Sequence, residues 1–211
     1  MHKSQAQAAA RRKLLAASRL VKPVRARNGR ALPPAWFITD PKRTKHPERI
    51  AVRLPRGFGV IFRHFGAKDR FDAGLRLAAV CRARGLVLLV SADPELARVI
   101  QADGVHWPEA SLRGVRGRNG RWIETASAHS PAAIARAAKL GVDAVIVSTV
   151  FESGSASAGK PMGALRFRQI ARASALPVYA LGGITPHNAA HAMMHAAGWA
   201  AIDAVVSGWN D

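Results

Sequence analysis

Short apolar runs alternate along this chain with longer segments whose apolar positions recur at helical spacing. There are eight such runs, and in most of them consecutive positions are apolar, as in strands buried on both faces. The predicted strands are Trp36–Thr39, Gly59–Arg63, Leu86–Val90, Gly104–Trp107, Thr125–His129, Ala144–Ser148, Pro177–Leu181 and Ala200–Ala204.

Amphipathic segments between these runs predict helices. Eight strands alternating with helices predict an α/β protein, a (β/α)₈ TIM barrel over residues 35–211, with a doubly wound open sheet as the structural alternative. The predicted helices are Asp69–Arg84, Pro94–Gln101, Pro131–Leu140, Ala164–Ser174 and Pro186–Ala197.

Residues 1–34 differ from the rest in composition, with nine Lys and Arg, no acidic residue, and a Pro33-Pro34 pair at the end. We interpret them as a basic extension, disordered or a frayed helix, lying outside the barrel. They lack the continuous apolar stretch of a secretory signal, whereas an organelle-targeting segment shares their Arg-rich, acid-free composition.

Charge and hydropathy narrow the class of protein. The formal charge of the 211 residues is +19, which favours anionic ligands or nucleic acid. The extension lacks aromatic residues for base stacking, so we do not expect a nucleic-acid partner. No apolar run approaches the roughly 18 residues of a membrane span, and the single cysteine, Cys81, excludes an internal disulfide framework. We expect a cytoplasmic protein without a membrane partner and leave its oligomeric state open.

Candidate chemistry gathers where the strands end, because a barrel of this type carries its working groups on the loops after the strands. After the seventh strand, Gly182 and Gly183 allow close backbone approach, and Thr185 is placed to cap a helix that starts at Pro186. Exposed amides at such a turn predict a phosphate cradle, although a plain strand-to-helix turn has the same sequence.

Two further segments have candidate ligands. The loop Ser153–Lys160 is small and polar, so Ser153, Ser155 and Lys160 are candidates to contact a phosphate, with a solvated linker as the alternative. His187, His191 and His195 share one face of the predicted helix Pro186–Ala197, a spacing that suits a transition metal but lacks acidic or cysteine partners. Dinucleotide, P-loop and cysteine-based zinc motifs are missing from the sequence.

Five motifs, in order through residues 35–205, resemble the thiamine phosphate synthase and thiazole tautomerase family. Each of them follows or overlaps a predicted strand, and the last is the closest match. They are Phe37-Ile38-Thr39-Asp40, Ala102-Asp103-Gly104-Val105-His106, Ser127-Ala128-His129-Ser130, Val150-Phe151 with Ser153 and Ser155, and Pro177–Pro186 with Asn188.

The resemblance implies a transferase of thiamine biosynthesis that joins hydroxymethylpyrimidine diphosphate to thiazole phosphate and releases diphosphate. It implies Mg²⁺ and basic side chains that neutralise the leaving group. Arg63 would contact diphosphate, while Ser127 and His129 would line the pocket. The substrate-binding set would be Ser153, Ser155, Lys160, Gly182, Gly183, Ile202 and Asp203.

Several family positions are substituted. Phe65 and Ala156 stand where the family has lysines, and Asp203 stands where it has a phosphate-binding serine. The two metal-binding aspartates fall on Ala92 and Ser111, although a shift of one residue would make Asp93 a ligand.

These substitutions make the metal requirement an open question, and we expect weak or absent synthase activity. Two alternatives stay open. One is a tautomerase-type enzyme in which His129 moves a proton on the thiazole. The other is a non-catalytic barrel that binds a phosphorylated ligand.

Overall fold

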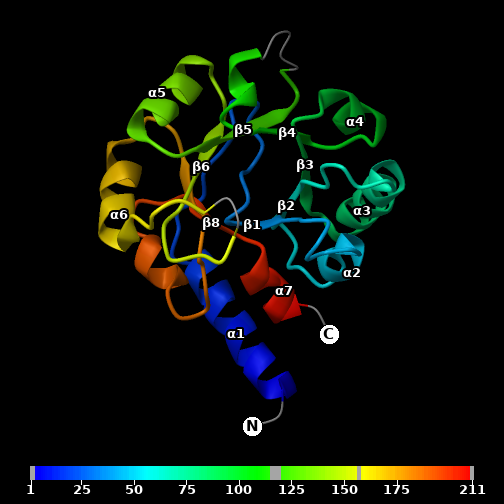
Figure 1. Cartoon of the computed structure of the whole chain (residues 1–211), viewed down its shortest axis with the longest axis horizontal. Helices are drawn as coiled ribbons and strands as arrows, with labels where there is room; N and C mark the ends of the chain where they lie inside the picture. The colour runs from blue at the N-terminus through cyan, green and yellow to red at the C-terminus, as the bar shows by residue number, and fades with distance from the viewer. Residues whose placement is uncertain (1–2, 115–119, 156–157, 210–211) are drawn as a thin grey trace.

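Eight parallel strands close into a barrel in chain order in the computed structural model, which describes residues 3–114, 120–155 and 158–209 (Figure 1). The barrel closes through pairing of the first strand with both the second and the eighth. The predicted (β/α)₈ barrel is therefore confirmed, and the open sheet is excluded. The strands are β1 (Ala35–Ile38), β2 (Gly59–Phe62), β3 (Val87–Ser91), β4 (Gly104–Trp107), β5 (Ile123–Ala128), β6 (Ala144–Val147), β7 (Val178–Ala180) and β8 (Gly198–Ala201).

Helices surround the strands (Figure 1). Two of them begin with a side-chain cap followed by proline: Asp93 accepts from the Leu96 amide, and Ser130 accepts from the Ala133 amide. The α-helices are α1 (Lys3–Ser18), α2 (Pro47–Ala51), α3 (Arg70–Arg84), α4 (Pro94–Val99), α5 (Pro131–Lys139), α6 (Gly163–Ala173) and α7 (Asp203–Trp209), and the 3₁₀ helices are η1 (Ser111–Gly114) and η2 (Ala189–Ala192).

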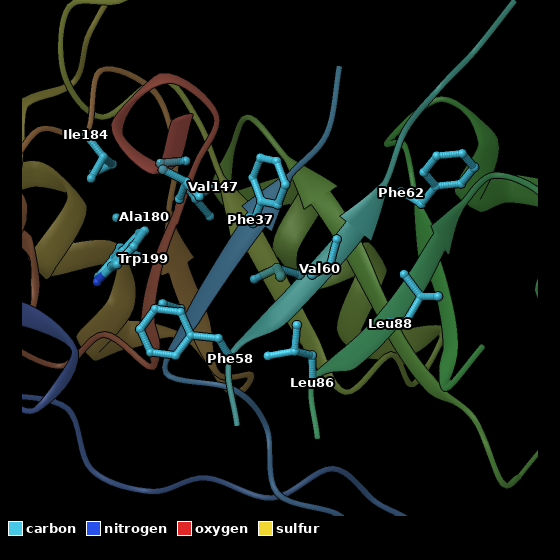
Figure 2. Close-up of a cluster of buried hydrophobic side chains, with 14 of the residues drawn as sticks. Phe37, Phe58, Val60, Phe62, Leu86, Leu88, Val147, Ala180, Ile184 and Trp199 are labelled. Carbon is cyan, nitrogen blue, oxygen red and sulfur yellow. The ribbon is translucent and has the colours of Figure 1, made fainter. Parts of the chain in front are cut away.

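The apolar residues form two clusters, because alternate strand residues point into the barrel and out toward the helices. The inner cluster contains Trp36, Leu89 and Tyr179. The outer cluster is larger, and Figure 2 shows Phe37 and Phe62 among its side chains on β1 and β2. The barrel is thus a filled core, and ligand chemistry is confined to its mouth.

Of the two interpretations of the N-terminal extension, disorder and a frayed helix, disorder is wrong for residues 3–18, which form the packed helix α1. Helix α1 lies beside α7 (Figure 1), and the Arg11 side chain donates to the Gly208 carbonyl over 3.0 Å. Its Leu14 and Ala17 are buried, and Ser18 accepts a hydrogen bond from the Trp199 indole of β8. The buried face contains one leucine among small residues, so hydrophobic periodicity gave little signal for this helix.

The rest of the extension covers the end of the barrel opposite the mouth. Ala26 and Leu32 are buried in the inner cluster. Arg27 donates to Asp143, and Arg30 pairs with Asp103 at 2.5 Å. Part of the basic charge that suggested an exposed tail is therefore used inside the molecule.

The predicted helix Pro186–Ala197 is also wrong. Only the short 3₁₀ helix η2 forms there, and His195 has a left-handed backbone with φ of 65°. Helix α1 packs beside this segment, where Lys13 Nζ lies 3.4 Å from His187 Nδ1. The three histidines therefore do not share an α-helical face, and no metal-binding cluster of three His, Cys, Asp or Glu residues occurs among the described residues.

Within the described ranges, none of the helices has the length and apolar character needed to cross a membrane.

Candidate functional site

One cavity opens at the mouth of the barrel, on the side formed by the loops after β6, β7 and β8. Its volume is about 270 Å³, and residues after β1 and β2 complete its wall. The lining residues are Ile38, Arg43, Arg63, Ser148, Thr149, Glu152, Ser153, Gly154, Ser155, Ala158, Leu181, Gly182, Gly183, Ile184, Thr185, Ala200, Ala201, Ile202 and Asp203.

The loop after β7 needs its two glycines for steric reasons. Gly182 and Gly183 have φ of 94° and 60°, values that side chains disfavour. A Cβ on Gly183 would lie 2.1 Å from the Glu152 carbonyl oxygen, and one on Gly182 would lie 2.8 Å from the Thr149 methyl carbon. The glycines thus allow the loops after β6 and β7 to touch each other at the cavity wall.

Several backbone amides at this turn can serve a ligand. In the described part of the chain, the N–H groups of Gly182, Gly183 and Ile184 donate no hydrogen bond. The Thr185 amide is taken by the Asn188 side chain, which in turn donates to the Gly183 carbonyl. Asn188 thereby shapes the turn that leaves three neighbouring amides for an anion.

The cavity also contains an ion-pair chain. Arg43 Nη1 donates to both carboxylate oxygens of Asp203, at 3.2 and 3.0 Å, and Arg43 Nη2 donates to Asp40 at 3.3 Å. Asp40 accepts further bonds from the Lys42 and Arg43 amides. Burial alone would raise the pKa of Asp40, but these hydrogen bonds and the Arg43 charge outweigh burial and hold that pKa below its ordinary value.

The loop after β6 supplies hydroxyls to the cavity. Ser153 Oγ accepts from the Ser155 amide at 3.3 Å, and both residues line the wall. Lys160 is exposed and does not line the cavity. Ala156, the substituted lysine position, lies outside the described residues.

Arg63 extends from the end of β2 into the cavity, and its guanidinium makes no hydrogen bond or ion pair with any described residue. His106 lies inside the barrel, where its ring nitrogens form hydrogen bonds with Thr125 Oγ1 and Ser127 Oγ, both at 2.9 Å. Complete burial, and secondarily the charge of Arg63, lower the pKa of His106 to about 3. His106 is therefore neutral. The Ser127 hydroxyl is hydrogen-bonded to it and does not line the cavity.

The opposite side of the mouth does not fit a divalent cation. Ala92, in place of an aspartate, has a left-handed φ of 55° and no ligand atom in its side chain. The Asp93 carboxylate caps α4 and pairs with Arg70 at 2.5 Å, while Arg70 also donates to the Ser91 carbonyl. Ser91 Oγ is buried without a partner in the described structure. An arginine thus occupies the neighbourhood in which Asp93 would serve a metal.

His129 also lies apart from the cavity. Its ring Nδ1 lies 2.8 Å from Glu109, which pairs with Arg136 as well, and its side chain is 56% exposed. Burial would raise the pKa of Glu109, but the bonds from His129 and the charges of His129 and Arg136 lower it. His129 is therefore an exposed partner in a surface ion-pair cluster.

Seven of the residues predicted to bind ligand are brought together, whereas Ser127, His129, Lys160 and Asp93 lie elsewhere. Sequence reasoning missed Arg43, which follows the first motif by three residues and could have been found as the basic residue nearest that strand end. The seven are Arg63, Ser153, Ser155, Gly182, Gly183, Ile202 and Asp203.

Comparisons with known proteins agree with this architecture. The thiamine monophosphate synthase family model (TMP-TENI) matches residues 35–205. A putative thiamine-phosphate synthase 2 from Aquifex aeolicus is 31% identical over 161 residues, which cover 73% of this chain and 87% of that protein. A thiamine-phosphate synthase from Geobacillus kaustophilus is 30% identical, with 73% and 75% covered.

A solved structure of thiamine phosphate pyrophosphorylase from Pyrococcus furiosus superimposes with a TM-score of 0.68 at 24% identity, covering 84% of this chain and 88% of that one. This likeness supports the fold, and the sequence matches support the lineage. The chain therefore belongs to the thiamine monophosphate synthase family.

Proposed function

We propose that this protein joins hydroxymethylpyrimidine diphosphate to thiazole phosphate, with release of diphosphate, at the cavity after β6–β8. The observation that carries the proposal is the row of three amides, at Gly182, Gly183 and Ile184, that donate no hydrogen bond to any described residue. The relatives of this chain include thiamine-phosphate synthases. The standard phosphate site of such barrels uses the loops after strands 7 and 8.

The amide row is suited to the phosphate of the thiazole. Backbone N–H groups hold an anion without side-chain entropy and with fixed geometry. Ile202 and Asp203 follow β8 on the adjoining wall, and their amides also donate no hydrogen bond among the described residues. Donors from two neighbouring loops thus converge on one phosphate.

The diphosphate of the pyrimidine substrate would lie toward Arg63, Ser153 and Ser155. When the bond from the pyrimidine methylene carbon to the diphosphate oxygen breaks, negative charge develops on the diphosphate and positive charge on the pyrimidine. Arg63 stabilises the departing charge, and the serine hydroxyls donate to its oxygens. The thiazole nitrogen then forms a bond to the methylene carbon.

Mg²⁺ is implied by the family resemblance, but no group of three or more His, Cys, Asp or Glu side chains that could hold a metal ion occurs among the described residues, and Ala92 and Ser111 stand at the two family aspartate positions. We therefore assign charge neutralisation of diphosphate to Arg63 and derive no step through a metal. A reaction with one leaving-group cation is expected to be slow, because each missing stabiliser of developing charge costs roughly 3 kcal/mol.

A ligand panel tests the proposal. Thiazole phosphate, thiamine phosphate and pyrophosphate are titrated by calorimetry and thermal shift, with and without Mg²⁺, and product is followed after mixing both substrates. We expect thiazole phosphate to bind without Mg²⁺ and thiamine phosphate to form slowly. Ligand binding with no product after prolonged incubation would instead favour a binding barrel, and thiazole isomerisation that survives chelation would favour a tautomerase.

A further inference from the structure

The charge lining the cavity differs from that of the whole protein. The chain has a formal charge of +19, yet the charged residues that line the cavity are two cations, Arg43 and Arg63, and two anions, Glu152 and Asp203. A site for a phosphate dianion is thus electrically balanced before the ligand arrives. One of the two cations, Arg43, contacts one of the two anions, Asp203.

Arg43 is engaged by two carboxylates. Its Nη1 gives both of its contacts to Asp203, at 3.2 and 3.0 Å, and its Nη2 contacts Asp40 at 3.3 Å. Both contacts to Asp203 come from the single nitrogen Nη1, and charge-assisted N–H donors of this kind also bind phosphate oxygens. Asp203 therefore fills, with its own carboxylate, the arginine edge that a phosphate in the same cavity would use.

The two carboxylates differ in how firmly they are held. The Asp40 side chain is 20% exposed and accepts hydrogen bonds from the backbone amides of Lys42 and Arg43 as well as from the Arg43 guanidinium. The Asp203 side chain is 73% exposed, and Arg43 is its sole hydrogen-bond partner among the described residues. Asp203 can leave at little cost, whereas Asp40 stays and keeps Arg43 oriented toward the cavity.

We propose that Asp203 is a specificity-determining residue that competes with the ligand phosphate for Arg43. Binding exchanges one anion for another on the same guanidinium: phosphate takes the Nη1 edge, and Asp203 turns to solvent. A monoanionic ligand has no advantage over the carboxylate that it must displace, whereas a phosphate dianion has. The exchange thereby selects for a phosphate monoester, and this selection deepens, and rests on, the proposed function.

The competition makes a quantitative expectation possible. Asp203→Asn keeps the shape of the side chain and removes the competing charge, so affinity for inorganic phosphate and for thiazole phosphate should rise about 10-fold, equivalent to about 1.4 kcal/mol. Asp203→Ser, which also shortens the side chain, should do the same. Arg43→Gln should weaken binding of both ligands.

Glu152→Gln is the matched control, because Glu152 is an exposed anion that lines the same cavity without contacting Arg43 in the described structure. A general field effect would act on both carboxylates alike. We expect Glu152→Gln to raise affinity no more than about 2-fold, and we expect the gain from Asp203→Asn to fall to a similar size in the Arg43→Gln background.

The experiment is calorimetric titration of inorganic phosphate and thiazole phosphate into the full chain and these variants, with circular dichroism to confirm folding. Equal gains from Asp203→Asn and Glu152→Gln, or a gain that is unchanged without Arg43, would overturn the inference and leave the proposed function standing. A different result would refute the proposed function alone. If inorganic phosphate shows the Arg43-dependent gain from Asp203→Asn but thiazole phosphate binds to none of the variants, Asp203 competes with phosphate and the proposed function is wrong.

Discussion

The two sides of the barrel mouth have different contents. On the β6–β8 side, backbone amides that donate no hydrogen bond among the described residues and two serines line a cavity of about 270 Å³, and Arg43 from the loop after β1 completes its wall. On the β3–β5 side, Asp93 is bound by Arg70 and by a helix amide, and Glu109 is bound by His129 and Arg136. The backbone amides and serines on the first side face the cavity, whereas the two carboxylates on the second side are held by neighbouring side chains.

The difference indicates which part of the reaction chemistry the fold retains. A phosphate cradle is made of backbone, so it persists as long as the loop geometry persists. A metal site is made of side chains, and one substitution, such as alanine at position 92, removes a ligand without disturbing the strand. The phosphate side of a divergent family member is thus expected to outlast its metal side.

The largest effect is expected at Gly183. Gly183→Ala places a Cβ against the Glu152 backbone and keeps a φ of 60°, so it should cost about 3 kcal/mol of unfolding free energy and at least about 100-fold in thiazole phosphate affinity. Chemical denaturation and calorimetry measure the two effects. Gly183→Asp would have the same steric clash and would also place a negative charge beside the bound phosphate.

Gly66→Ala is the control, because Gly66 lies in the loop after β2 and does not line the cavity. Gly66 has φ of 71°, but an added Cβ would meet nothing within 4 Å. Only the backbone cost of about 1 kcal/mol should appear, with phosphate affinity unchanged. Similar affinity losses in both variants would show that the cradle does not depend on the contact between the two loops.

The second prediction concerns the buried His106. Its folded pKa of about 3 lies below the ordinary value of 6.5, so the unfolded chain takes up a proton as pH falls below 6.5 while the folded chain does not. The contribution of neutral His106 to the free energy of unfolding is fully present above pH 6.5. It falls by about 2–3 kcal/mol between pH 7 and pH 4.5. His106→Gln should remove this part of the pH dependence in urea denaturation; an unchanged slope would mean that His106 titrates normally.

The third prediction concerns Asp93. Asp93→Ala removes the cap of α4 and leaves Arg70 without its partner, so it should cost about 2 kcal/mol, whereas Asp93→Asn, which can still cap, should cost about half as much. Phosphate affinity should not change in either variant. A loss of Mg²⁺ response on mutation of Asp93 would show that it is a metal ligand after all.

The smallest effect is expected at His129. Its hydrogen bond with Glu109 is on the surface, and exposed polar contacts of this kind contribute roughly 0–1 kcal/mol. His129→Gln should therefore leave unfolding free energy within about 0.5 kcal/mol and thiazole phosphate binding unchanged. Loss of thiazole isomerisation in that variant, if the unmodified protein has this activity, would restore His129 to a catalytic role.

The fold was readable from sequence because buried parallel strands are apolar on consecutive positions, and all eight were found to within three residues at either end. The packed helix α1 could not be identified from the sequence, because its buried face has Leu14 beside the small residues Ala17 and Ser18. The segment after Pro186 reads as helical in isolation, but α1 packs against it and only η2 forms there.

The part of the site that is formed by backbone amides was predictable from the sequence. Gly182 and Gly183 have a recognisable pattern, since few other residues fit the turn. Arg43, which lies on a loop with no motif, was missed, because its role depends on Asp203, 160 positions away. The ion pairs of Asp93 and His129 were likewise invisible, because each is decided by a partner on a different loop.

A steady-state assay with hydroxymethylpyrimidine diphosphate and thiazole phosphate, run across a Mg²⁺ titration, tests the central claim that the phosphate side is kept and the metal side is lost. The unmodified protein should form thiamine phosphate slowly, without saturating at submillimolar Mg²⁺. Phe65→Lys with Ala92→Asp should raise the rate by about 10-fold or more, since aspartate tolerates the left-handed backbone at position 92. Fast turnover by the unmodified protein that saturates at low Mg²⁺, with no gain in the double variant, would contradict the account.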